Sequence, residues 1–243
     1  MKFQTSLTHI KNGKEIIRGR ALEDIVNNNS FTEAIYLLLR GELPIGAQTK
    51  MFNAILTSVI DHGPGTASAM TARISASAMN PLHASVAAGL LGMGERHGVV
   101  ISQAMDFFYE NLEIKNLKIR IEEMKANKQY LMGYGHKVFT DEDPRTTTLF
   151  EIAKEADIFG KHCELAQICG KILNEISSRP LPLNADGAIA AILCDMGFDS
   201  RLGNGIFVIA RVPGLVAHVI EEMMNDQGIR RVPEEEVEYV AIV

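Results

Sequence analysis

The sequence predicts an all-α fold that is preceded by a short β-hairpin. Apolar residues recur at helical spacing over most of the 243-residue chain. Only about the first twenty residues alternate like strands, and no later segment resembles a strand of a parallel sheet. Hydrophobic residues make up 47% of the chain and charged residues 22%, which is the balance of an ordinary globular protein.

The hairpin is expected near the N-terminus. Residues 7–10 and 15–18 flank Asn12-Gly13, a pair that tolerates the positive φ of a tight hairpin turn.

The first long helix begins at a capping box. Ser30 and Glu33 have the required spacing, and Gly41 and Pro44 end the helix. A second helix is expected over 47–60.

The stretch from 67 to 88 is crowded with Ala and Ser, and a helix there permits close contact with another helix. It is therefore our candidate for a dimer interface. The remaining helical segments follow the same periodicity, and they are 83–94, 100–112, 116–130, 145–157, 162–178, 185–196 and 204–226. The last contains Pro213-Gly214, where we expect a kink or a break.

Composition excludes several classes of protein. The net charge of −6 argues against a nucleic-acid-binding domain. The sequence has no run of about 18 apolar residues, so it predicts no membrane span. The three cysteines are an odd number without a CxxC pair, which favours reduced thiols. We therefore expect a soluble, cytoplasmic protein.

Four glycine-containing loops carry polar or charged residues, at 61–65, 94–98, 133–137 and 183–187. Three of the loops contain a histidine and the fourth contains Asp186. A metal site could use these groups, but the short ligand spacing of zinc sites is absent. Proton transfer next to a carbonyl would use the aspartate as a base and neutral imidazoles as donors to an oxyanion.

Arginines provide candidate anion-binding groups, because guanidinium forks match carboxylates. The candidates are Arg73, Arg145, Arg211, Arg230 and Arg231. Apolar neighbours predict that Arg211 is buried, and a buried arginine needs an anionic partner.

These loops, in this order, resemble those of the citrate synthase superfamily over nearly the whole chain. The resemblance implies that His97 and His136 are the catalytic histidines and that Asp186 is the catalytic aspartate. It implies that the substrate carboxylates are bound by His62, Arg145, Arg211 and Arg231. It also implies a homodimer in which Arg231 is donated across the interface.

The implied fold is a two-domain, citrate-synthase-like helical fold with a trimmed large domain. Residues 1–103 plus 208–243 would form the large, dimerisation domain, and residues 104–207 would form the small domain. The short distance from Pro44 to Asp61 resembles citryl-CoA lyase, either free-standing or as the C-terminal module of ATP-citrate lyase. Val99-Val100 and the run 188–190 depart from the usual pattern, which leaves the acyl substrate open.

The implied activity is cleavage of citryl-CoA to oxaloacetate and acetyl-CoA through an acetyl-CoA enol. Coenzyme A would arrive as part of the thioester substrate, with no permanent cofactor and no metal. It would lie along Met132, Gly133, Tyr134, Gly135 and Lys137.

Three alternatives remain open. They are a compact citrate or 2-methylcitrate synthase, a non-catalytic CoA-ester-binding subunit, and a His/Asp metal hydrolase. A citrate–CoA ligase is a possible partner.

Overall fold

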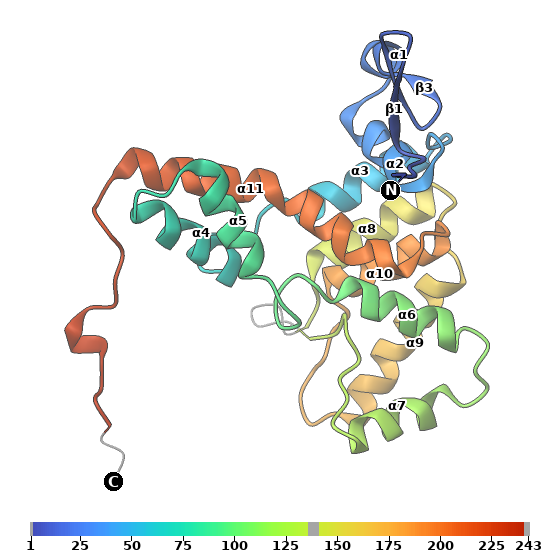
Figure 1. Cartoon of the computed structure of the whole chain (residues 1–243). Helices are drawn as coiled ribbons and strands as arrows, with labels where there is room; N and C mark the ends of the chain where they lie inside the picture. Colours follow the sequence, from blue (N-terminus) through green and yellow to red (C-terminus); the bar gives the residue numbers. More distant parts are fainter. Residues whose placement is uncertain (1, 136–140, 241–243) are drawn as a thin grey trace. The chain divides into compact units, whose positions relative to one another are not determined.

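The computed structural model describes residues 2–135 and 141–240, and the chain forms two compact units (Figure 1). Unit 1 contains Met1–Ser58 and Val100–Ile206, and unit 2 contains Val59–Val99 and Phe207–Val243. The predicted domains differ from these units chiefly in placing residues 1–58 with the large domain. They stay a prediction, because packing within one chain does not identify a dimerisation domain.

The N-terminal hairpin is confirmed and gains a third strand. Strands β1 (Thr8–Lys11), β2 (Lys14–Ile17) and β3 (Arg20–Ala21) form an antiparallel sheet in the order β1-β2-β3. Asn12 and Gly13 turn the chain with φ of 53° and 74°, as the pair predicts. Helix α1 (Leu22–Asn28) follows β3, and neither was expected from the sequence.

The capping box at the start of α2 (Phe31–Arg40) is also confirmed. The Ser30 hydroxyl accepts the Glu33 N–H at 3.3 Å, and the Glu33 carboxylate accepts the Ser30 N–H at 2.7 Å. Gly41 ends the helix at φ 82°, in the left-handed region. Helix α3 (Gln48–Ser58) packs beside α2.

Helix α10 (Ala185–Asp195) is the central helix of unit 1. Its residues from Ala185 to Cys194 are buried except Asp186. It packs against α6 (Ile101–Asn111), α8 (Pro144–Glu155) and α9 (Lys161–Ile176), as Figure 1 shows. Helix α7 (Leu117–Ala126) and the short η1 (Ser200–Leu202) complete the unit. A nearly continuous apolar surface explains why α10 takes the central position.

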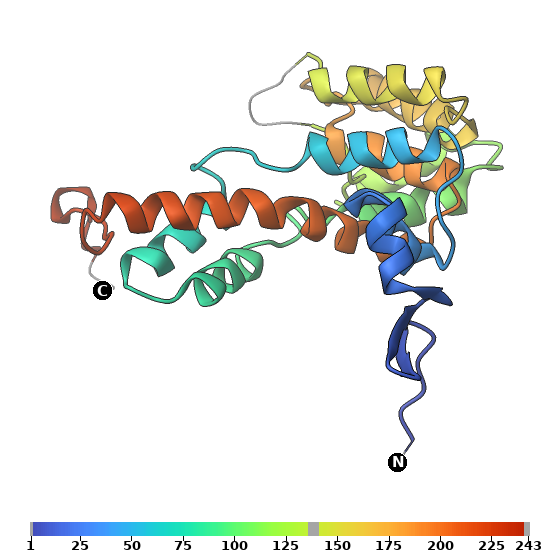
Figure 2. The same ribbon diagram turned by 90° about the horizontal axis from the view of Figure 1, so that it is seen from above.

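Unit 2 is built on α4 (Ala67–Ser77), α5 (Leu82–Leu91) and the greater part of α11 (Gly203–Asn225) (Figure 2). The stretch 67–88 is two helices, because the chain turns at Met79 with φ 63°. The small residues Ala72 and Ala76 pack with Leu215 and Val219 in the core.

Of the predicted kink or break at Pro213, the break is wrong, since α11 continues through it, and the kink stays a prediction. Gly214 has a packing role instead. A Cβ atom there would collide with the Ile60 carbonyl oxygen and lie 3.0 Å from the Asp61 carboxylate. The Pro-Gly pair therefore lets the turn after α3 lie directly against α11.

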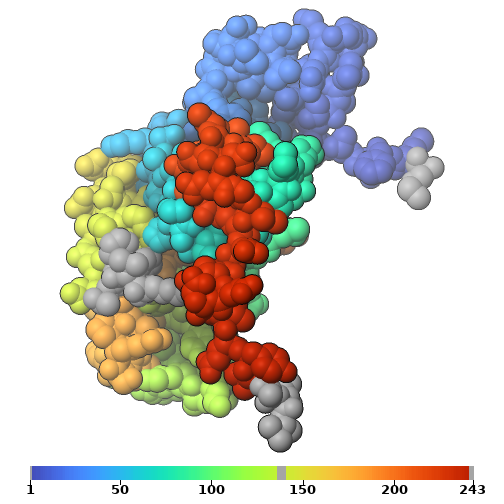
Figure 3. Space-filling view, turned by 90° about the vertical axis from the view of Figure 1, so that its left-hand side faces the viewer, coloured from blue at the N-terminus to red at the C-terminus, as the bar shows by residue number. Residues whose placement is uncertain are grey.

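Among the described residues, Ser200–Asn225 is the one helix long and apolar enough to cross a membrane. Core helices meet the same criteria of length and composition. Arg211, near the middle of this helix, is 2% exposed. After α11 the chain forms an exposed segment with a single turn, η2 (Glu234–Glu236), which Figure 3 shows in red.

Candidate active site

The N-terminus of α10 is hydrogen-bonded to the loop that contains Gly133 and Gly135. Asn184 is the N-cap residue, and its side-chain oxygen accepts the Gly187 N–H at 3.2 Å. Its amide nitrogen donates to the Gly135 carbonyl at 2.8 Å. Its backbone N–H donates to the Gly133 carbonyl at 2.9 Å. One asparagine thus ties together two of the loops that the sequence identified.

Two glycines make this contact possible. Gly133 has φ +89°, and a Cβ atom on it would lie 2.5 Å from the Gly187 Cα. A Cβ atom on Gly187 would lie 2.5 Å from the Gly133 oxygen. Any larger residue would separate the two loops, so their glycines are explained by packing.

Tyr134 anchors the same loop to α9. Its hydroxyl donates to the Ala166 carbonyl at 2.8 Å. Burial raises the pKa of this tyrosine well above its ordinary value. Tyr134 therefore has a structural role in addition to its predicted contact with coenzyme A. His136 and Lys137, the other predicted residues of this loop, lie outside the described residues.

Asp186 is in the first turn of α10 and is half-buried. The positive end of the helix dipole stabilises a carboxylate at this position.

Arg145 lies in the first turn of α8 and is held by a residue that the sequence analysis did not select. Asp143 is fully buried, and its carboxylate accepts hydrogen bonds from Nε of Arg145 at 3.0 Å and from Nη2 at 2.7 Å. Burial opposes ionisation of Asp143, yet the Arg145 side chain and the backbone N–H groups of Arg145 and Ala185 together lower its pKa. The signal was present in the printed sequence, because Asp-Pro is a common helix start.

His97 lies in unit 2, in a turn closed by two backbone hydrogen bonds with Gly94, at 2.7 and 2.9 Å. Its Nε2 atom lies 2.8 Å from the hydroxyl oxygen of Ser68 on α4. Gly98, the next residue, has φ +83°, and a Cβ there would lie 2.5 Å from the Phe207 ring. Ser68 could not be predicted as a partner of His97, because nothing local links residues 29 positions apart.

His62 is exposed in the turn before α4. The preceding Asp61 accepts the Gly63 N–H at 3.0 Å, and its carboxylate lies 3.0 Å from Nε2 of His218 on α11. Partial burial raises the pKa of Asp61, but the backbone N–H groups of Gly63 and His62 and the His218 side chain outweigh it, and the pKa is lowered. His218 was also missed by the sequence analysis.

The prediction that Arg211 is buried is confirmed. Its Nε donates to the Val59 carbonyl at 2.8 Å, and its guanidinium carbon lies 4.8 Å from the centre of the Phe207 ring. These contacts fix its orientation on α11.

Two of the other candidate arginines bind protein carboxylates. Arg73 contacts Glu221 and Glu222, and its Nε lies 2.8 Å from Glu222. Arg230 donates Nη2 to Glu222 at 2.9 Å. Arg231 is exposed, and its predicted role across a dimer interface stays a prediction.

The predicted site residues are thus divided between the units. Asp186, Arg145 and the loop Met132–Gly135 belong to unit 1, and His62, His97, Arg211 and Arg231 belong to unit 2. Within residues 2–135 and 141–240, no group of three or more His, Cys, Asp or Glu side chains is placed to hold a metal ion.

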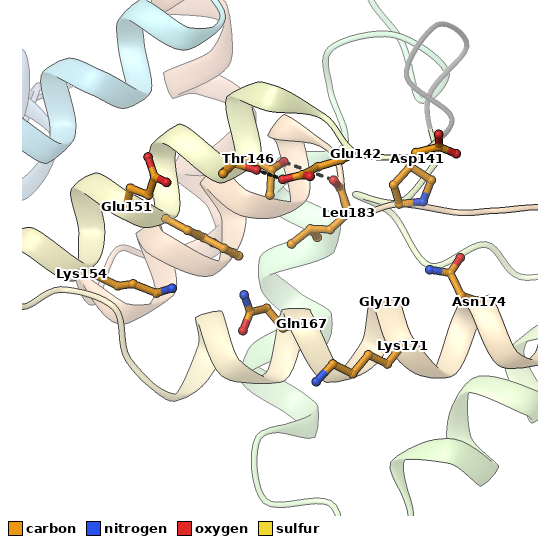
Figure 4. A pocket seen from close by; sticks show the side chains of 13 residues that line it. Asp141, Glu142, Thr146, Glu151, Lys154, Gln167, Gly170, Lys171, Asn174 and Leu183 are labelled. Atoms are coloured by element: carbon orange, nitrogen blue, oxygen red, sulfur yellow. Dashed lines mark hydrogen bonds between the residues drawn. The ribbon is translucent and has the colours of Figure 1, made fainter.

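A cleft of about 490 Å³ lies between α8 and α9 in unit 1 (Figure 4). Lys154 and Lys171 share it with Asp141, Glu142 and Glu151. In the described part of the chain, none of the predicted site residues lines it. Its mixed charge gives no preference for an anion or a cation.

The family model described as "Citrate synthase, C-terminal domain" matches residues 1–58 and 47–232. Citrate synthase 2 of Bacillus subtilis is 27% identical over 227 residues, which are 93% of this chain and 59% of that protein. The 2-methylcitrate synthase of Shewanella oneidensis is 29% identical over 197 residues, which are 79% of this chain and 52% of that protein. The chain therefore spans little more than half the length of these two relatives.

Solved structures agree over a larger part of the chain. The citryl-CoA lyase of Hydrogenobacter thermophilus has a TM-score of 0.92 and 43% identity, covering 99% of this chain and 95% of that one. The ATP citrate lyase of Methanosaeta concilii has a TM-score of 0.88 and 23% identity, covering 100% of this chain and 42% of that one, which is a likeness of fold. By its fold and by the family model that spans it, this chain belongs to the citrate synthase family of enzymes.

Proposed function

We propose that this chain is a citryl-CoA lyase. The observation that carries the proposal is its likeness to the Hydrogenobacter thermophilus citryl-CoA lyase, which covers nearly all of both chains. The two curated synthases compared above are less similar, at 27% and 29% identity, and extend well beyond the matched region. The substrate would be citryl-CoA, so coenzyme A enters as part of the thioester.

The reaction is a retro-Claisen cleavage. The tertiary hydroxyl of citryl-CoA loses its proton to His136, and its oxygen–carbon bond becomes the carbonyl of oxaloacetate. The neighbouring carbon–carbon bond breaks, and its electron pair forms the enolate of acetyl-CoA, which becomes the enol when the His97 N–H proton moves to its oxygen. His97, as a neutral donor, stabilises the charge that grows on the thioester oxygen. Asp186, which enters this step as the carboxylic acid, then delivers its proton to the enol carbon while the enol O–H proton returns to His97, which gives acetyl-CoA. Asp186 is left as the carboxylate that the N-terminus of α10 stabilises, and the proton taken by His136 restores its acid form for the next turnover.

The structural features of unit 1 support the role given to Asp186. The Asn184 cap and the Gly133–Gly187 contact restrict the first turn of α10. A rigid position matters, because misplacing a reacting group by 1 Å can cost about 10²-fold in rate. His62, Arg145, Arg211 and Arg231 would hold the carboxylates, as cationic or hydrogen-bonding groups can.

The test is to mix the purified protein with citryl-CoA and to measure oxaloacetate release. We expect turnover that Asp186→Asn reduces by about 10²-fold or more, the usual contribution of a positioned acid or base. Absence of turnover would refute the lyase assignment and favour the non-catalytic subunit. Turnover unaffected by Asp186→Asn would remove the role of this carboxylate.

A compact citrate or 2-methylcitrate synthase is the second candidate, and the curated synthase relatives favour it. The same residues serve both directions, because each step is reversible. The ratio of the cleavage rate to the condensation rate, measured with acetyl-CoA and propionyl-CoA, separates the two proposals.

We also propose a homodimer with Arg231 donated to the partner's site. The test mixes Arg231→Gln chains, each inactive alone, with Asp186→Asn chains. A mixed dimer contains one intact site if the arginine crosses the interface, so random exchange restores about a quarter of the full activity. No recovery after demonstrated exchange would place Arg231 in its own chain's site, and an Arg231→Gln chain that is active alone would place it outside any site.

A further inference from the structure

Asp143 holds Arg145 by a pair of parallel hydrogen bonds. Its Oδ1 receives Nε of Arg145 at 3.0 Å, and its Oδ2 receives Nη2 at 2.7 Å. The Arg145 backbone N–H also donates to Oδ1, at 3.1 Å. A substrate carboxylate can take the Nε–Nη2 edge of this guanidinium only by displacing Asp143, so it must approach from another side.

The same carboxylate also contacts the helix that carries Asp186. Oδ2 of Asp143 accepts the backbone N–H of Ala185 at 3.0 Å. Ala185 is the first residue of α10 and precedes Asp186. One fully buried carboxylate is therefore shared between the start of α8 and the start of α10. Anions are stabilised at helix N-termini, and this one lies at two of them.

The segment Asp199-Ser200-Arg201 has the same Asp-x-Arg pattern as Asp143-Pro144-Arg145. Comparing the two shows which contacts of Asp143 follow from the pattern alone. Asp199 accepts the Arg201 backbone N–H and Nε, both at 2.9 Å, so the cap and the pairing are the same. The Asp199 side chain is 43% exposed, however, and among the described residues its carboxylate accepts hydrogen bonds from Arg201 alone. The burial of Asp143 and its bond to Ala185 are thus additions to the local motif.

We propose that Asp143 is a positioning residue that sets the orientation of the Arg145 guanidinium and the place of the α10 N-terminus, and with it Asp186. The inference rests on the proposed function, because it assigns Arg145 to the substrate and Asp186 to proton transfer. On this proposal, both roles depend on the Asp143 carboxylate, which contacts neither the substrate nor the reacting atoms.

The first experiment compares Asp143→Asn with the matched control Asp199→Asn in citryl-CoA cleavage. An amide cannot accept all four N–H groups that contact Oδ1 and Oδ2 of Asp143 in the same way. We expect kcat to fall and KM to rise, with kcat/KM lower by about 10- to 100-fold. Asp199→Asn keeps the wild-type values. Equal activity of the wild type and Asp143→Asn overturns the inference and leaves the proposed function standing, whereas a wild type without turnover overturns both.

A second variant separates the two contacts and still serves if Asp143→Asn does not fold. Ala185→Pro removes the donor to Asp143 at the first position of a helix, where proline is tolerated. It keeps the pair with Arg145. We expect kcat to fall while KM changes little, whereas Arg145→Gln raises KM. A folded Ala185→Pro variant with wild-type kcat overturns the part of the inference that concerns α10.

A double-mutant cycle distinguishes positioning from support of the fold. If Asp143 acts on substrate binding through Arg145, Asp143→Asn raises KM much less when Arg145→Gln is already present. Thermal stability of the double variant should recover relative to Asp143→Asn, because the half-buried guanidinium is removed. Activity should not recover with it. Additive effects on KM, or activity that follows stability across the set, would show that Asp143 only supports the fold.

Discussion

The hydroxyl oxygen of Ser68 lies 2.8 Å from Nε2 of His97. Ser68 is fully buried in the first turn of α4, so its hydroxyl is confined near the imidazole. A hydroxyl can donate to a ring nitrogen or accept from it. Ser68 therefore helps to determine which nitrogen of His97 carries the proton, and a neutral donor role for His97 depends on that choice.

Ser68→Ala should lower kcat for citryl-CoA cleavage by up to about 10²-fold, because the imidazole loses a partner that orients it. Ser85→Ala is the matched control. Ser85 is equally buried in unit 2, and its hydroxyl donates to the Asn80 carbonyl at 3.4 Å. Steady-state kinetics on both variants check the prediction. Equal losses in both would mean that Ser68 matters for packing and not for His97.

Gly187→Ala should displace the Gly133–Gly135 loop from the start of α10. The new Cβ atom would lie 2.5 Å from the Gly133 oxygen and 2.6 Å from a Leu183 methyl carbon. We expect a stability loss of about 1–3 kcal/mol from overpacking, measured by denaturant unfolding, together with a loss of activity. Gly205→Ala, with no atom within 4 Å of its new Cβ, should be neutral or gain about 0.5–1 kcal/mol. A stable and active Gly187→Ala variant would contradict the close contact.

The three thiols should be unreactive in the folded protein. Cys163, Cys169 and Cys194 are all buried. Burial raises the pKa of each, to about 12 for Cys169, and the thiolate is the reactive form. A thiol reagent near neutral pH should label none of the three before unfolding and all three in denaturant. Fast labelling of the native protein would place at least one thiol near solvent.

Acid should weaken unit 2 through Glu222, which is 4% exposed between Arg73 and Arg230. The Arg230 hydrogen bonds and charge, with Arg73, lower the pKa of Glu222 despite burial. Because the folded-state pKa lies below the unfolded value, the stabilisation is present above the unfolded pKa of about 4.5 and is lost as the pH falls through the folded pKa. The free energy of unfolding should therefore fall as the solution is acidified below that value.

Glu222→Gln should reduce this pH dependence and cost about 1–3 kcal/mol at neutral pH, since the hydrogen bonds from Arg73 and Arg230 lose the carboxylate charge and one acceptor oxygen. Glu221→Gln is the control, because that neighbouring side chain is 60% exposed and its ion pair with Arg73 contributes about 0–1 kcal/mol. An unchanged pH profile in Glu222→Gln would assign the acid sensitivity to other carboxylates.

Local features of the fold could be predicted from the sequence. The Asn12-Gly13 turn and the Ser30–Glu33 capping box depend on neighbouring residues, and both are confirmed. The break at Pro213 was wrong, since α11 is continuous there, and the glycine of the Pro-Gly pair serves the close approach of the Ile60–Asp61 turn instead. That approach is a tertiary contact, which local patterns do not reveal.

In the candidate site, too, local patterns could be predicted and tertiary contacts could not. Residue types in the glycine-containing loops selected Asp186 and His97, and the match between guanidinium and carboxylate selected Arg145. The residues that hold these groups were missed, because Ser68 reaches His97 from another helix and Asp143 reaches Ala185 across 42 positions. Such partners become visible only when the helices are packed.

The most direct test of the lyase proposal is cleavage of citryl-CoA in D2O, with both products analysed. The account predicts that oxaloacetate and acetyl-CoA appear in equal amounts, that the acetyl methyl group carries one deuterium delivered at Asp186, and that Asp186→Asn nearly abolishes both. Citryl-CoA that stays intact with the folded wild-type protein, or an Asp186→Asn variant that forms deuterated acetyl-CoA at the wild-type rate, would contradict it.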